Sequence, residues 1–387
     1  MRDKGLPEKI VFKELERRLK KDFTYESGRI IGSMCNNPHP LARKVYTRFM
    51  EKNLGDSGLF PAVAELEKET IQMIGTLLSN PDASGHIISG GTEANILALW
   101  AAKKIAKKKN CEAIVPVSGH CSFDKAGDLL DVKIIRAGLD SKFRVDTDAV
   151  RKAITPNTIA IVGVAGTTGL GAVDPVSELS EVASENDLYL HVDAAFGGFV
   201  LPFLKELGMS VPSFDFAEPR VCSMTVDPHK MGLAPIPAGG ILFRSEELRE
   251  TLAWNISYLA GGEAKHATIM GTRSGASVLA VWSLLKHLEI EGYTRIVKRC
   301  MRLTQKLADE IPQIRGLEMM TKPTMNILGL TSSKLDVKLI AQELRLKGWA
   351  VALFPKHIRL VVMPHVQETH IDEFLEDLRK VAHKLGG

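Results

Sequence analysis

The chain has 387 residues, of which 45% are hydrophobic and 25% are charged, and its formal net charge is +4. This length allows a large buried core and two compact parts in an ordinary globular protein. So small a net charge does not favour nucleic acid or an anionic membrane as a partner. We expect no secretory signal and no membrane span, because no apolar run is long enough. The five scattered cysteines form no CxxC pair, which favours a reduced, cytoplasmic compartment.

The first 250 residues are predicted to alternate between helices and short strands. Residues 1–50 should form helices separated by the loop GSMCNNPHP, and PAVAELEKETIQMIGTLL has apolar residues at helical spacing. The predicted strands are HIISG, AIVPVS, VKIIRAG, IAIVGVAG, LYLHVDAAF, VCSMTV and GGILFR. Apolar strands joined by helices are typical of a mostly parallel sheet covered on both faces, here with seven strands.

After residue 246 the pattern changes. A long helical region at 276–311 leads to NILGLTSS, WAVALFP and HIRLVVMPH, and the amphipathic stretch HIDEFLEDLRKVAHKL follows. This order predicts a smaller α+β C-terminal domain. We therefore predict an N-terminal helical segment (1–50), a large α/β domain (51–275), and a linking helix with the small domain (276–387).

Ligands of open α/β sheets bind beyond the carboxyl ends of the strands, and the motif SGGTEAN lies at such an end. Gly91 lets the backbone approach a phosphate closely, while the free N–H groups of the helix start attract anions. Thr92 adds a hydroxyl group. A glycine turn capped by Thr92 explains the motif equally well. The motif matches neither GxGxxG nor the P-loop, which disfavours dinucleotide and P-loop sites.

Two further strand ends carry a histidine and an aspartate. His120, in GHCSFDKAG, is by itself more typical of a structural histidine. Asp193 ends the apolar strand LYLHVDAAF, where a carboxylate is costly unless a cation or hydrogen-bond donors meet it. His191 and Asp193 could instead be two metal ligands. No third ligand follows at a familiar spacing, so we expect no metal.

The fourth strand end carries Lys230, in the sequence SMTVDPHKMG. Lysine is rarely buried without a partner, so Lys230 is either a solvated surface charge or a group that forms a covalent bond to a ligand. A strand-end pocket shared with other cations should lower its pKa and make it an amine nucleophile. Pyridoxal 5'-phosphate would use all four groups, namely an anion loop, a ring-facing histidine, a carboxylate for the pyridine nitrogen and a lysine for the aldehyde.

These motifs, with NLGDSGLFP and AGTTGLG, resemble those of the group II amino-acid decarboxylases, among the fold-type I pyridoxal-phosphate enzymes. The archaeal tyrosine/aspartate decarboxylase branch is the most similar, and the resemblance covers essentially the whole chain. It implies an aspartate-aminotransferase-like α/β fold, pyridoxal 5'-phosphate as cofactor, and a homodimer with shared active sites.

The resemblance also implies roles for single residues. Lys230 would anchor the aldehyde, His120 would stack on the ring, and Asp193 would pair with the pyridinium. Many relatives have asparagine where this chain has Asp227, so its contact with the phosphate stays open. The residues that would bind the cofactor are Gly91, Thr92, His120, Thr168, Asp193, Ala195, Asp227, His229 and Lys230, with Gly271 and Thr272 approaching the cofactor of the neighbouring subunit.

The implied reaction releases CO₂ from an L-amino acid. Arg359 would bind the substrate carboxylate, although a strand-edge arginine is its alternative interpretation. Tyr258, on a glycine-containing loop, would return a proton to Cα, with His229 as the rival acid.

The substrate is expected to be L-tyrosine, giving tyramine, or L-aspartate, giving the coenzyme A precursor β-alanine, with L-glutamate as a third candidate. A cysteine desulfurase using Cys121, a tRNA-dependent cysteine-forming enzyme and a non-catalytic cofactor-binding protein are the alternatives. The low net charge disfavours the tRNA-dependent enzyme.

Overall fold

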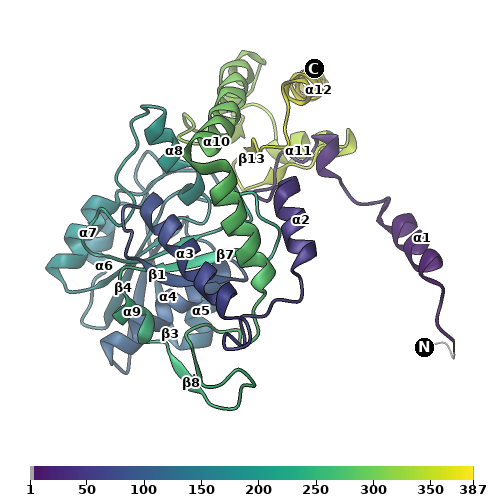
Figure 1. Ribbon diagram of the computed structural model, residues 1–387. Coiled ribbons are helices and arrows are strands. Elements are labelled where there is room, and N and C mark those ends of the chain that lie inside the picture. The colour runs from purple at the N-terminus through teal and green to yellow at the C-terminus, as the bar shows by residue number, and fades with distance from the viewer. Residues whose placement is uncertain (1–3, 387) are drawn as a thin grey trace.

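A seven-stranded sheet forms the centre of the molecule in a computed structural model that describes residues 4–386 (Figure 1). The strand order is β1-β7-β6-β5-β4-β2-β3, and β7 runs antiparallel to both neighbours. The prediction of a mostly parallel seven-stranded sheet is confirmed. Its strands are β1 (Ser84–Ile88), β2 (Cys111–Pro116), β3 (Val132–Ala137), β4 (Thr158–Val164), β5 (Tyr189–Asp193), β6 (Val221–Val226) and β7 (Gly239–Phe243).

The strands alternate their side chains between two cores, one on each face of the sheet. In β4, Ile161 belongs to one core, which also contains residues of 61–77, 176–185, 201–206 and 275–310, while Ala160 and Val162 belong to the other, which contains residues of 91–106 and 122–130. The helices in the part of the chain that forms the large sheet are α3 (Pro61–Leu77), α4 (Gly91–Ala106), α5 (Ser122–Leu130), α6 (Thr147–Ala153), α7 (Val176–Glu185), α8 (Leu201–Glu206) and α9 (Glu246–Glu250), with the 3-10 turn η2 (Gly197–Phe199).

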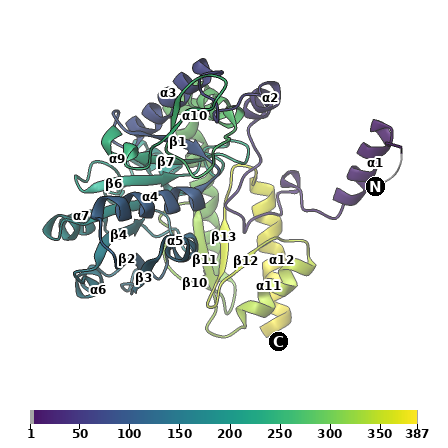
Figure 2. The ribbon, with the colours of Figure 1, turned by 90° about the horizontal axis from the view of Figure 1, so that it is seen from below.

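A second, antiparallel sheet with the order β10-β11-β13-β12 forms the smaller part, and α11 and α12 lie together beside it (Figure 2). The long helix α10 (Gly275–Glu310) contributes to both parts, because Leu284 lies in one large core and Leu307 in the small one. Its helical geometry breaks at Glu289, whose φ is 48°. The remaining elements are η3 (Ile311–Gln313), β10 (Glu318–Met319), β11 (Ile327–Thr331), α11 (Val337–Leu346), β12 (Ala352–Leu353), β13 (Ile358–Val361) and α12 (Glu368–Gly386).

The N-terminal segment contributes residues to both parts. It contains α1 (Glu8–Leu19), the 3-10 turn η1 (Tyr25–Ser27) and α2 (Pro40–Arg48). Between η1 and α2, Ile31 enters the small core and accepts a hydrogen bond from Val361 N. By contrast, α1 stands away from the body in both views (Figures 1 and 2). The domain boundaries after residues 50 and 275 stay predictions.

A two-stranded hairpin, which was not predicted, flanks the predicted loop around Tyr258. It pairs β8 (Trp254–Ile256) with β9 (Ala264–His266) and projects from the large sheet (Figure 1). Helices α5, α8, α9 and α11 were likewise not among the predicted elements. Within residues 4–386, no helix is long and apolar enough to cross a membrane. All five cysteines are free.

Candidate active site

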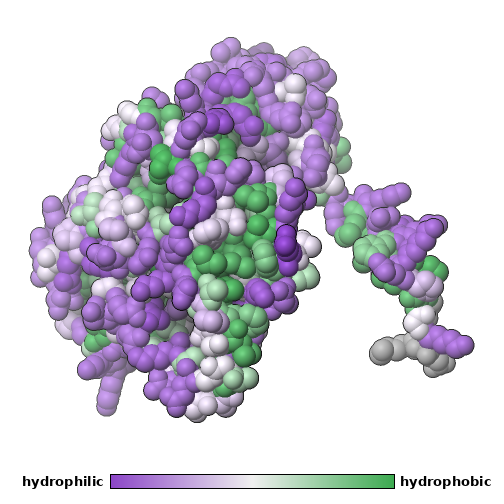
Figure 3. Space-filling view, in the orientation of Figure 1, coloured by the Kyte–Doolittle hydropathy of each residue, from purple (hydrophilic) through white to green (hydrophobic). Residues whose placement is uncertain are grey.

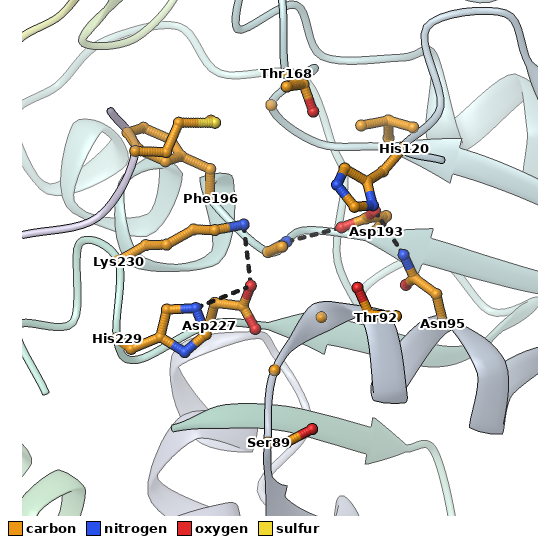
Figure 4. Close-up of a pocket in the computed structure, with 16 residues that line it drawn as sticks. Ser89, Thr92, Asn95, His120, Thr168, Asp193, Phe196, Asp227, His229 and Lys230 are labelled. Atoms are coloured by element: carbon orange, nitrogen blue, oxygen red, sulfur yellow. Dashed lines mark hydrogen bonds and ion pairs between the residues drawn. The ribbon is translucent and has the colours of Figure 1, made fainter. Parts of the chain in front are cut away.

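The carboxyl ends of β1, β4, β5 and β6 surround one cavity of about 320 Å³ (Figure 4). This size falls within the range of small-molecule sites, about 300–1,000 Å³. Segments far apart in the chain meet here because parallel strands bring their carboxyl ends to one edge of the sheet. The residues that line the cavity are Met34, Ser89, Gly90, Gly91, Thr92, Asn95, His120, Val164, Gly166, Thr168, Asp193, Ala195, Phe196, Asp227, His229 and Lys230.

The SGGTEAN motif forms the turn from β1 into α4, as predicted. Gly90 is the N-cap residue, and no side chain caps the helix, so the capping role considered for Thr92 is not observed. The N–H groups of the first turn are therefore available to an anion in the cavity. A Cβ atom at Gly91 would lie 2.9 Å from Asp227 Oδ2 and 3.5 Å from Ala195 Cβ. A larger residue at position 91 would fill the space that the turn leaves open.

Asp193 lies at the end of β5, and only 6% of it is exposed. Its Oδ1 accepts a hydrogen bond from Ala195 N at 3.1 Å, and its Oδ2 accepts one from Asn95 Nδ2 at 3.0 Å. No lysine, arginine or histidine forms an ion pair with it among residues 4–386. The carboxylate is thus held by neutral donors, and a cationic ligand would supply the missing charge partner.

Lys230 lies across the cavity from Asp193 and pairs with a different carboxylate. Its Nζ is 2.9 Å from Asp227 Oδ2, and His229 Nε2 is 3.7 Å from the same oxygen. The predicted lowering of the Lys230 pKa is wrong for this protein without ligand. Burial by itself lowers that pKa, but the carboxylates of Asp227 and Asp193 outweigh burial and raise it. The prediction assumed that cations surround Lys230, whereas carboxylates dominate its surroundings.

The N-terminal segment supports the lysine from behind. Asn36 donates from Nδ2 to the main-chain oxygen of His229 at 2.9 Å and also to that of Lys230. Asp227 Oδ1 is buried and has no hydrogen-bond partner in the part of the chain that the structure describes. A polar ligand in the cavity would supply the hydrogen-bond partner that this oxygen lacks, and the open space beside Gly91 gives the ligand room.

His120 and Thr168 line the cavity from the loops after β2 and β4. His120 Nδ1 accepts a hydrogen bond from Ser122 N at 3.2 Å, and the exposed Cys121 lies beside it. Arg359 is not a lining residue. Its guanidinium donates to Thr168 O at 2.9 Å and to Gly32 O at 2.6 Å, so it ties the small part to the wall of the cavity.

Three of the predicted site residues lie away from this cavity within the same chain. Tyr258 is 84% exposed on the loop between β8 and β9. Gly271 and Thr272 do not line the cavity, and Thr272 lines a smaller one beside Arg273. Their role at the neighbouring subunit's site stays a prediction.

Seven lining residues were absent from the predicted site residues, namely Met34, Ser89, Gly90, Asn95, Val164, Gly166 and Phe196. Ser89 and Asn95 belong to the SGGTEAN motif, and Asn95 follows Gly91 by four residues, which places it on the same helix face. Their nearness to the motif could have identified them. Met34 and Phe196 carried no comparable signal, because an apolar side chain near a site resembles any other core residue.

The open α/β sheet, with a lysine, an isolated carboxylate and an uncapped helix start at its strand ends, defines a fold-type I pyridoxal-phosphate enzyme. The orphaned Asp227 oxygen and the unpaired Asp193 carboxylate fit a ligand with both polar and cationic parts. The conserved domain of pyridoxal-dependent decarboxylases matches residues 3–330. The chain belongs to this family, its cofactor is pyridoxal 5'-phosphate, and it is a carboxy-lyase.

Similar proteins agree with this assignment. The chain is 49% identical to an L-aspartate/L-glutamate decarboxylase of Pyrococcus horikoshii, over 97% of this chain and 98% of that protein. It is also 49% identical to a probable L-tyrosine/L-aspartate decarboxylase of Methanothermobacter thermautotrophicus, over 92% and 98%. Among solved structures, a sphingosine-1-phosphate lyase of Burkholderia pseudomallei has a TM-score of 0.92 at 28% identity, over 100% of this chain and 92% of that chain.

Proposed function

We propose that this protein decarboxylates L-aspartate, forming β-alanine and CO₂. The observation that supports this proposal is that Lys230, Asp193 and the Gly90-Gly91 turn line the same cavity. Similar proteins of Pyrococcus horikoshii and Thermococcus kodakarensis bear the names L-aspartate/L-glutamate decarboxylase and L-aspartate decarboxylase, the latter at 47% identity over 99% of this chain. L-Glutamate is a further candidate for the same reason.

The charges of the cavity support roles for its residues toward the cofactor. The start of α4, with Gly91 and Thr92, would hold the phosphate, because its N–H groups are uncapped. Asp193 would pair with the protonated pyridine nitrogen, since only neutral donors hold it. Lys230 would anchor the aldehyde.

The remaining contacts would orient the ring. His120 would stack on one face and Ala195 would pack under the other, while Thr168 would approach the ring hydroxyl. His229 would contact the phosphate or the substrate. Asp227 is placed to hold the Lys230 amine by an ion pair, and a direct contact between this carboxylate and an anionic phosphate would be repulsive.

The bound cofactor supplies an electron sink for the bonding pair that CO₂ leaves behind at Cα. The protein has to orient the substrate and to return one proton. Arg359 is proposed to attract the substrate carboxylate, although two of its nitrogens already donate to main-chain oxygens. Burial lowers the pKa of His229, so it is neutral near pH 7 and a poor acid. We therefore favour Tyr258 of a partner subunit as the proton donor.

L-Tyrosine is the second candidate substrate, and a specific cavity favours it. An apolar cavity of about 620 Å³ opens beside His120 and Thr168, and Leu139, Phe143 and Phe354 are among its walls. An aromatic side chain would be transferred favourably into such surroundings, whereas a second carboxylate would lose hydration there. A relative named L-tyrosine/L-aspartate decarboxylase agrees with dual use.

We also propose that the protein works as a homodimer in the cytoplasm. The apolar side chains on α1 are exposed, and Tyr258, Gly271 and Thr272 do not line the cavity of their own chain. A second subunit would explain both observations. The five free cysteines support a reducing compartment.

The test combines cofactor labelling with a substrate screen. Purified protein should absorb visible light after addition of pyridoxal 5'-phosphate, and borohydride reduction followed by peptide mass spectrometry should place the label on Lys230. CO₂ release should then be measured with L-aspartate, L-tyrosine, L-glutamate and L-phenylalanine, with Lys230→Ala as the inactive control. Labelling at another lysine would refute the anchor, and release from none of the four would refute the proposed substrates.

A further inference from the structure

A buried set of polar side chains lies directly behind Asp193. Asn95 belongs to the first turns of α4, His191 precedes Asp193 by two residues on β5, and Thr225 and Ser223 lie on β6. In the parallel pairing of the two strands, His191 is opposite Ser223 and Asp193 is opposite Thr225. All four are buried, with Asn95 1% exposed and His191 fully covered. So many polar groups in a core require mutual hydrogen bonds.

The hydrogen bonds of Asn95 determine which way its side-chain amide points. Its Nδ2 donates to Asp193 Oδ2 at 3.0 Å and to Ser122 Oγ at 2.8 Å. Its Oδ1 accepts from Thr225 Oγ1 at 2.7 Å and lies 3.1 Å from His191 Nε2. A flipped amide would aim its oxygen at the Asp193 carboxylate, which is repulsive because neither group can donate.

His191 completes this arrangement from the other side. Burial lowers the pKa of His191 to about 4, so the ring is neutral near pH 7. The Asn95 oxygen can only accept, so His191 donates from Nε2, which leaves Nδ1 to accept from Ser223 Oγ at 2.8 Å. A neutral ring adds no positive charge behind Asp193. His191 therefore does not compete with a cationic ligand on the cavity side of Asp193.

We propose that Asn95, oriented by His191, is a positioning residue that directs the ionised Asp193 carboxylate toward the cationic ring nitrogen of the cofactor. This inference rests on the proposed role of Asp193. It assigns Asn95 a function toward the cofactor without direct participation in the reaction. Each Asp193 oxygen keeps one neutral donor, Ala195 N or Asn95 Nδ2, so the remaining lone pairs can face the cofactor.

The principal test is Asn95→Leu, which keeps the size of the side chain and removes its donor and acceptor. Equilibrium titration with pyridoxal 5'-phosphate should show affinity reduced by about tenfold or more, the effect of one lost hydrogen bond to a charged group. The visible absorbance of the bound cofactor changes with pH, and the midpoint of this change should move to higher pH. The reason is that a ring nitrogen that has lost its proton withdraws less electron density from the rest of the cofactor. A merely structural role of Asn95 would not move that pH.

Two further variants keep the test decisive if Asn95→Leu does not fold. His191→Gln retains an N–H group that can reach Asn95, whereas His191→Phe retains only the ring shape. The inference requires the Gln variant to hold the cofactor more tightly than the Phe variant. Equal affinities, or wild-type affinity and titration pH in a folded Asn95→Leu protein, would overturn it.

The matched control is Thr304→Val in α10, which removes a buried hydroxyl group bonded only within its own helix. Its cofactor affinity and titration pH should equal those of the wild type. The wild-type protein itself separates the two proposals. If it bound no cofactor at all, the proposed function would fail, whereas a failure confined to the Asn95 and His191 variants would affect only this inference.

Discussion

The charge on Lys230 depends on a residue three positions earlier in the chain. Its amine lies 2.9 Å from Asp227 Oδ2, and this carboxylate, with Asp193, keeps the ammonium form stable despite burial. A lysine that must react as an amine has to lose this proton first. In the protein without ligand, the ion pair therefore keeps the Lys230 side chain in its charged ammonium form.

His191 should make the protein sensitive to acid. Its folded-state pKa of about 4 lies below the ordinary value of 6.5, so only the unfolded chain takes up a proton between these values. Stability is therefore unaffected above pH 6.5 and is lost as the pH falls toward 4, by roughly 3 kcal/mol at most. Urea unfolding of His191→Gln and wild type at pH 7.5 and 4.5 should show a smaller acid loss for the variant. Equal losses in both proteins would contradict the depressed pKa.

At the scale of elements, Glu67 joins α3 to β1 and to the loop before α10. It pairs through both oxygens with Arg273, at 2.5 and 3.0 Å, and accepts from Ile87 N at 3.0 Å. Burial alone would raise the pKa of Glu67, but Arg273 and His86 hold it well below its usual range. The loop that carries Thr272 is thus joined to α3 by an ion pair and to β1 by a hydrogen bond from Arg273 to Ile87 O.

Glu67→Gln should lower the free energy of unfolding by about 3 kcal/mol or more near pH 7, because it leaves the buried Arg273 without its counter-charge. The difference from wild type should persist above the ordinary glutamate pKa, about 4.3, and shrink as the pH falls through the folded-state value. Urea unfolding at several pH values measures this difference.

The control for this pair lies on the same helix. Glu69 is half-exposed and pairs with Lys286 at 3.1 Å, so Glu69→Gln should change stability by less than about 1 kcal/mol. Equal effects of the two substitutions would show that the buried pair has no special weight.

The β8–β9 hairpin carries Tyr258 into solvent in its own chain. Tyr258→Phe should reduce the turnover number by about a hundredfold, the effect of a lost general acid, with cofactor affinity and melting temperature unchanged. The exposed position of Tyr258 explains why stability should not respond. Steady-state CO₂ release gives the turnover, and Tyr46→Phe on α2 is the matched control. Wild-type turnover of Tyr258→Phe would return the role of acid to His229.

At the scale of the whole molecule, uncovered hydrophobic surface points outward in two places. Hydrophobic residues are visible on α1 and on the face over α3 and α10 (Figure 3). Large apolar side chains exposed on α1 include Ile10, Phe12, Leu15 and Leu19. Contiguous apolar surface of this kind is typical of an interface, in line with the proposed homodimer.

Hybrid dimers can test whether the sites are shared. Lys230→Ala and Tyr258→Phe should each be nearly inactive alone. If Tyr258 serves the partner's cavity, a mixture that exchanges subunits should regain about a quarter of wild-type activity, because half of the dimers would contain one complete site. Light scattering establishes the dimer, and mixing without subunit exchange is the control. An active monomer, or no recovery after exchange, would contradict shared sites.

The fold and most of the cavity could be predicted because their signals are local. Apolar runs of strand length and helical periodicity identified all seven strands of the large sheet, and β1, β4, β5 and β6 end beside the cavity. The helices α5 and α11 were missed although their buried residues follow helical spacing, such as Phe123 and Ala126 or Ile340 and Leu344. The strands β8 and β9 were missed because three residues each are too short for a periodic signal.

The sequence by itself determined the large, mostly parallel sheet, the family and the groups at the strand ends, because residue spacing along strands and helices is set by backbone geometry. Only the tertiary structure decided that Asp227 and not Asp193 pairs with Lys230, and that Asn95 and Asn36 support the two ends of the site. These contacts join segments up to 194 residues apart, and their electrostatic effects depend on distances and burial that exist only after the chain has packed.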